Sequence, residues 1–72
     1  MKKYRIEAYL HKWPGSFDRL RQESMISKEV ECEDETAARK ELDKLISAKV
    51  ERLDKEGFRS RVERRLVQAM DL

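Results

Sequence analysis

The N-terminal part of the chain alternates apolar and polar residues. In the stretch KYRIEAYLH, from Lys3 to His11, every second residue is apolar, which is typical of a β-strand with one buried face. We therefore predict a first strand over Lys3–His11. Its buried side carries Tyr4, Ile6, Ala8 and Leu10, and its exposed side carries Arg5, Glu7, Tyr9 and His11.

A turn and a second strand follow. Pro14 and Gly15, in WPGS, suit the central positions of a type II turn, because proline fixes φ and glycine accepts a positive φ. The stretch MISKEVECE, residues 25–33, then predicts a strand. Three of its apolar residues share one face: Ile26, Val30 and Cys32. Lys28 interrupts that face, which favours an edge strand where its ammonium group can reach water.

Residues 34–57 carry the clearest pattern in the chain. Apolar residues recur there at steps of three and four, which predicts an amphipathic helix. These residues are Ala38, Leu42, Leu45, Ile46, Val50 and Leu53. Asp34 or Thr36 can cap the start of this helix, and Gly57 stands where helices commonly end in a glycine of positive φ. Opposite charges four residues apart, such as Glu35 and Arg39, indicate a solvated outer face.

The closing segment, residues 58–70, fits two structures. As a strand it buries Phe58, Ser60, Val62, Leu66 and Met70 and exposes Arg59, Arg61, Glu63 and Arg65. Arg64 would then point inward unless a β-bulge intervenes. As a helix, its apolar residues also align at steps of four, and Ser60 with Glu63 forms a capping box. Because two strands alone make a marginal sheet, we favour a strand from Phe58 to about Val67.

The order strand, strand, helix, strand predicts an α+β fold with ββαβ topology. The helix returns the chain across the sheet, so the third strand should run parallel to the second and antiparallel to the first. The expected sheet has three strands, mainly antiparallel, in the order 2-1-3, with one helix packed on one face. This topology resembles half of a ferredoxin-like split β-α-β fold, an analogy that carries no function.

Length and cysteine content narrow the picture further. The 72 residues, 1–72, fit a single small domain with a modest core, which a partner subunit often supplements, so a homodimer is one expectation. One cysteine, Cys32, excludes an internal disulfide and a multi-cysteine zinc site, and a lone thiol fits a reducing, cytoplasmic location. The start of the chain lacks the apolar stretch of a secretory signal, and no apolar run is long enough to cross a membrane.

Charge is abundant but nearly balanced. Charged residues make up 44% of the chain, yet the formal net charge is +2. The pI of about 8.8 lies just below the range of nucleic-acid binders, about 9 or more. Both ends of the chain are basic, whereas residues 23–36 hold six acidic residues and one lysine. Neighbouring strands should therefore neutralise each other, with Arg5 facing either Glu31 or Glu29 according to the register.

No group of residues indicates catalysis or metal binding. Cys32 and His11 are the one nucleophile–imidazole couple, but the predicted hairpin separates them by about 20 Å on opposite faces. The acidic stretch ECEDE, residues 31–35, lacks the spacing and the glycine of a calcium loop and suits the start of a helix. We expect no enzyme activity and no bound metal or cofactor.

Two surfaces are candidates for binding. The first is the sheet face that the helix leaves uncovered, and its candidate contacts to nucleic acid or a protein partner are Arg5, Tyr9, Arg59, Arg61 and Arg65. The second is the aromatic pair Trp13 and Phe17 at a loop tip, of which one ring is expected in the core and the other against a partner. We favour a small non-enzymatic binding or regulatory module that acts through protein–protein contacts, including self-association. The alternative is nucleic-acid binding by the arginine-rich open face.

Overall fold

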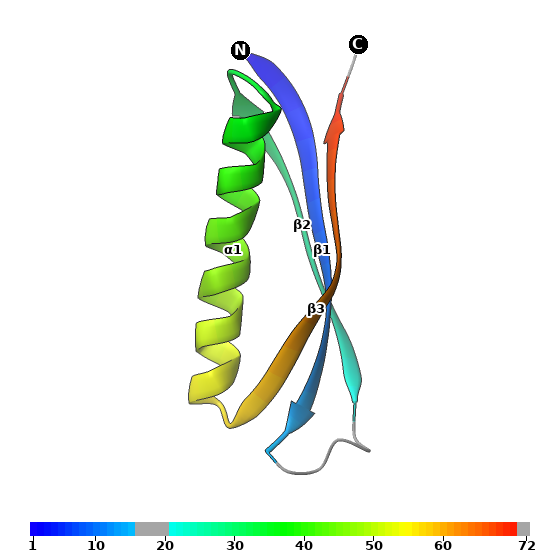
Figure 1. The fold of residues 1–72 in the computed structure, drawn as a ribbon, viewed down its shortest axis with the longest axis vertical. Coiled ribbons are helices and arrows are strands. Elements are labelled where there is room, and N and C mark those ends of the chain that lie inside the picture. The colour runs from blue at the N-terminus through cyan, green and yellow to red at the C-terminus, as the bar shows by residue number, and fades with distance from the viewer. Residues whose placement is uncertain (16–20, 71–72) are drawn as a thin grey trace.

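A computed structural model describes residues 1–15 and 21–70, and it has the predicted ββαβ order (Figure 1). The elements are β1 (Lys2–Pro14), β2 (Gln22–Cys32), α1 (Glu35–Lys55) and β3 (Phe58–Ala69). Both β2 and β3 pair antiparallel with β1, which gives the strand order β2-β1-β3. The α+β architecture, the strand order and the helix on one face of the sheet are thereby confirmed, and Phe58–Ala69 is a strand rather than a helix.

The hairpin of β1 and β2 is longer than the alternation of residues predicts. β1 continues through Trp13 and Pro14, and β2 begins at Gln22 rather than Met25. The part of β2 before Met25 consists of polar residues, whose pattern does not predict a strand. Pairing with β1 therefore extends β2 into this part. Gly15 follows β1 with a φ of 41°, the positive value expected for the turn.

The core lies between β1 and α1. Its buried members are Tyr4, Ile6, Ala8, Leu10, Cys32, Ala38, Leu42 and Ile46. Because one helix is too narrow to cover a three-stranded sheet completely, apolar residues on the flanking strands are only partly buried, Ile26 and Val62 among them. Val50, which helical spacing predicts for the core, is 37% exposed, since it lies on the flank of α1.

Both ends of α1 are capped by the residues that the sequence indicates. Of the two candidates for the N-cap, Asp34 takes the position, and its Oδ1 accepts a hydrogen bond from the backbone N–H of Ala37 at 2.9 Å. At the other end, Gly57 has a φ of 87° and donates its N–H to the carbonyl oxygen of Asp54 at 3.0 Å.

A β-bulge divides β3 into two halves. Leu10 pairs with Val62 and the preceding residue Tyr9 pairs with Arg64, so Glu63 is an extra residue without a partner on β1. An extra residue shifts the side-chain alternation by one position beyond the bulge. Glu63 and Arg64 are therefore consecutive residues on the same side of the sheet, and the alternation resumes with Arg65 on the other side.

The bulge corrects the predicted orientation of the second half of β3. Arg65 pairs with Ala8 and so lies on the helix side of the sheet, not on the exposed side. Arg64 takes its place on the exposed side, opposite Tyr9. Leu66 pairs with Glu7 and therefore lies on the exposed side rather than in the core, and the same alternation moves Met70 there.

Candidate functional site

No element among residues 1–15 and 21–70 covers the side of the sheet opposite α1, and we name this side the open face. Alternation along the strands assigns to it Lys3, Arg5, Glu7, Tyr9, His11 and Trp13 of β1, Glu23, Met25, Ser27, Glu29 and Glu31 of β2, and Arg59, Arg61, Glu63, Arg64, Leu66 and Gln68 of β3. Taken together, the three strands contribute as many acidic as basic side chains to the open face. A face of this composition attracts neither sign of charge over a long distance.

Apolar and aromatic side chains occupy the middle of the open face. Tyr9 and Met25 pair across β1 and β2, and they are 39% and 55% exposed. Leu66 lies diagonally from Tyr9 on β3 and is partly buried. A shallow hollow of about 340 Å³ lies beside Tyr9 and Met25 and also contacts His11. We name Tyr9, Met25 and Leu66 the apolar centre.

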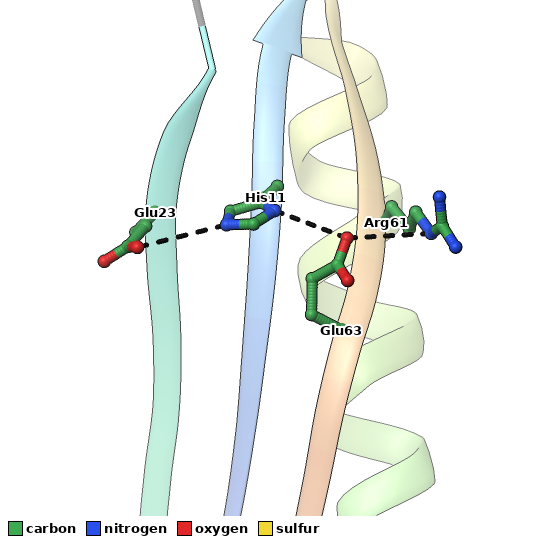
Figure 2. A network of polar contacts seen from close by, with 4 residues as sticks. All are labelled: His11, Glu23, Arg61 and Glu63. Carbon is green, nitrogen blue, oxygen red and sulfur yellow. Dashed lines mark hydrogen bonds and ion pairs between the residues drawn. The ribbon is translucent and has the colours of Figure 1, made fainter.

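A row of polar contacts crosses all three strands next to the apolar centre (Figure 2). The Nδ1 atom of His11 lies 3.3 Å from Oε1 of Glu63, and its Nε2 atom lies 4.0 Å from Oε1 of Glu23. The same Glu63 oxygen lies 3.6 Å from Nε of Arg61. The bulge brings Glu63 into this row, because in a regular strand the residue after Val62 would pair with Tyr9 instead of standing beside His11.

A second ion pair lies toward the other end of the open face. Ala8 faces Ile26, and of the two registers that the sequence allows, this one sets Arg5 opposite Glu29. Nη2 of Arg5 lies 3.7 Å from Oε1 of Glu29, and both side chains are about half exposed. Exposed pairs of this kind contribute about 0–1 kcal/mol to stability, so the pair chiefly neutralises charge on the surface.

The five predicted contact residues are not all brought together. Arg5, Tyr9, Arg59 and Arg61 share the open face, but Arg65 lies on the other side of the sheet, where its Nε is 3.9 Å from Oδ1 of Asp43 on α1. Arg5 and Arg61 each lie next to a glutamate. Within the described part of the chain, Arg59 and Arg64 of the open face form no ion pair, so both are available to an anionic ligand.

Trp13 lies within β1 rather than in a loop. It pairs with Arg59 of β3, and the guanidinium carbon of Arg21 lies 5.3 Å from the centroid of its ring, a cation–π contact. This end of the open face therefore holds an aromatic ring between two arginines. The side-chain pattern of the sequence does not indicate Arg21, because its position opposite Trp13 depends on the extended hairpin. Phe17, the other predicted aromatic contact, lies outside the described residues.

The residues considered for catalysis and for metal binding do not form a site in the structure. Cys32 is buried opposite Lys2, at the far end of the hairpin from His11, as the predicted register requires. Across residues 1–15 and 21–70, no three histidine, cysteine or acidic side chains are placed to hold a metal ion. The one helix that the structure describes is not long and apolar enough to cross a membrane.

Comparison with known proteins gave no relative. No protein-family model matches the chain, and neither the curated proteins nor the solved structures that were searched contain a match.

Proposed function

We propose that this chain is a small binding module that contacts a protein partner through the open face of its sheet. The observation that carries the proposal is the exposure of Tyr9 and Met25 side by side in the apolar centre. Protein interfaces combine an apolar core, rich in aromatic residues and methionine, with a polar rim. The ion pairs Arg5–Glu29 and Arg61–Glu63 lie on either side of this centre and supply such a rim.

The charge of the open face favours a protein partner over a polyanion. Nucleic-acid binding draws its affinity from cations that neutralise phosphates, and glutamates on the same face oppose it. Here Glu29 and Glu63 lie next to two of the arginines, and a third, Arg65, lies on the helix side of the sheet. A partner with both signs of charge fits this face better than a uniformly negative one.

A photo-crosslinking experiment tests the proposal. A benzophenone amino acid replaces Tyr9 in one variant and Lys44, on the exposed side of α1, in the control. In cells that make the protein, the probe at position 9 should give one discrete protein adduct, and Met25→Glu in the same chain should remove it. The proposal fails if position 9 gives no adduct, or if the Lys44 control gives the same adduct in equal yield.

A second candidate function, single-stranded nucleic-acid binding, rests on the row Arg21, Trp13 and Arg59. An aromatic ring flanked by arginines can stack a base while the guanidinium groups contact phosphates. Because Trp13 is the single tryptophan, its fluorescence reports directly on this site. Titration with short DNA and RNA should quench it more weakly as salt rises, and Arg59→Glu should abolish the effect. The absence of quenching at low salt would exclude this function.

A further inference from the structure

The flank of the molecule formed by β3 and α1 is a second interaction surface, separate from the open face. We propose that a second copy of this chain binds there, with the two β3 edges paired antiparallel about a two-fold axis. The pairing joins the two sheets into one of six strands with both helices on the same side. This inference rests on the edge of β3 and on the grooves beside α1, whereas the proposed function rests on the apolar centre of the open face.

Two grooves run along this flank, between α1 and β3. The large groove, of about 710 Å³, lies at the end of α1 and the start of β3, and its lining includes Val50, Phe58 and Ser60. The small groove, of about 410 Å³, lies nearer the start of α1, and its lining includes Leu42 and Val67. The large groove therefore offers Val50 and Phe58 to a neighbouring molecule, and the small groove offers Val67 above the buried Leu42.

Within the described residues, β3 is an edge strand whose outer hydrogen-bonding groups on this flank are unpaired. Met70 donates its N–H to the carbonyl oxygen of Lys3 at 2.9 Å, and Gly15 donates to Gly57 at 3.0 Å, which sets the phase of the β1–β3 ladder on both sides of the bulge. From this phase, the residues that direct their N–H and C=O groups to the outer edge are Phe58, Ser60, Val62, Arg65, Val67 and Ala69. An unpaired row of this kind is a template for another strand.

One antiparallel register pairs these free groups on both sides of the bulge. It sets Ser60 opposite Val67 of the partner subunit, and Phe58 opposite Ala69 of the partner subunit. The two bulges then meet at the centre, where Arg64 stands opposite Glu63 of the partner subunit, an ion pair that the symmetry forms twice. In this register the first half of β3 in each copy pairs with the second half in the other.

The same two-fold rotation sets the large groove of each copy against the small groove of the other, because Ser60 lines the first and Val67 the second. The charges of the two grooves are complementary. Glu51, Asp54 and Arg59 line the large groove, which leaves it one negative charge in excess, whereas Arg39, Arg65 and Asp43 line the small one, which leaves it one positive charge in excess. Complementary charges on facing surfaces fix the register and disfavour other pairings.

The size of the flank suits a dimer interface. Seen down the shortest axis, helix and sheet lie side by side, and the Cα atoms extend over 44 by 18 Å (Figure 1). A rectangle of these extents covers about 800 Å² in projection, which is comparable with the surface of roughly 800 Å² that each partner contributes to a protein interface of standard size. The open face, with extents of 44 by 14 Å, is smaller.

The opposite flank, formed by β2 and α1, lacks these features. The charged residues lining its groove are both cations, Lys49 and Arg52. Lys28 is exposed in the middle of β2, on the helix side of the sheet, and an inward-pointing lysine on an edge strand discourages pairing with another strand. On β3 the corresponding cation, Arg65, is next to Asp43, so this deterrent is weaker.

Charge reversal on the two grooves tests the proposal by analytical ultracentrifugation. One variant carries Glu51→Lys and Asp54→Lys, and the other carries Arg39→Glu and Arg65→Glu. Each should dimerise at least about tenfold more weakly than the natural chain, because both groove contacts of its homodimer join like charges. The matched control, Lys40→Glu with Lys44→Glu, reverses exposed charges on the outer side of α1 and should leave the dissociation constant unchanged.

The decisive sample is an equimolar mixture of the two variants. Every groove contact in a mixed dimer joins opposite charges, so the mixture should recover the affinity of the natural chain, which also shows that both variants are folded. A natural chain that stays monomeric at about 1 mM overturns the proposal. So does a dimer whose affinity neither variant changes, or two weakened variants, both folded by circular dichroism, that fail to associate with each other.

Discussion

The carboxylate of Glu63 lies 3.3 Å from Nδ1 of His11, although Glu63 has no pairing partner on β1. A single extra residue in β3 thus brings an acidic group beside the histidine of the central strand. The same extra residue lets both halves of β3 keep apolar side chains toward α1, Val62 before the bulge and Val67 after it. The bulge therefore adds a polar group to the open face without removing an apolar side chain from the core.

The first prediction concerns deletion of Glu63. Without this residue β3 alternates regularly and no other side chain changes face, so stability should fall by less than about 1 kcal/mol. Deletion of Glu7 is the matched control, since it removes a glutamate of the same face from the central strand. That deletion turns half of the buried side of β1 outward, and the chain should fail to fold. Urea unfolding of both variants measures the difference, and equal losses would contradict the bulge.

The architecture follows from two local patterns in the sequence. The period of two around Ile6 and the three- and four-residue steps around Leu42 each identify an element with one buried face. Residues 58–70 carry both patterns, and there local propensity slightly favours a helix. The sheet decides the outcome, because β1 is the central strand and carries buried side chains. It therefore needs a paired strand on its second edge as well as on its first.

The second prediction concerns Gly57, whose φ of 87° lies in the left-handed region. A Cβ atom built there meets nothing within 4 Å, so substitution strains the backbone alone. Gly57→Ala should reduce the free energy of unfolding by about 1–2 kcal/mol. Gly57→Asn is the control and should cost less, because asparagine tolerates this region better. An alanine variant as stable as the natural chain would show that α1 does not end in this way.

The third prediction separates the core of α1 from its flank. Leu42 is 1% exposed, so Leu42→Ala should cost about 2–5 kcal/mol. Val50 follows the same helical spacing but is 37% exposed, so Val50→Ala should cost less than about 1 kcal/mol. Chemical unfolding measures both values. Similar losses for the two variants would place Val50 in the core, as its spacing alone predicts, and would remove it from the groove beside β3.

The candidate site was harder to predict than the fold. The polar character of the open face can be predicted from the sequence. So can the pairing of Arg5 with one of two glutamates, because that pairing depends only on the register of one hairpin. The row through His11 depends on the register of both neighbouring strands and on the position of the bulge. The doublet Arg64–Arg65 indicates that the alternation breaks, but not which residue is extra, so regular alternation places Arg65 on the wrong face.

Occupancy of the open face can be measured directly by thiol alkylation. Met25→Cys sets a reactive thiol in the apolar centre, and Lys44→Cys sets one on the outer side of α1, while the natural Cys32 is buried. A partner on the open face excludes water from the apolar centre. The ratio of the alkylation rate of the thiol at position 25 to that of the thiol at position 44 should therefore be roughly tenfold lower in cells than in the purified protein. An unchanged ratio of the two rates would contradict the proposal that this face binds a protein.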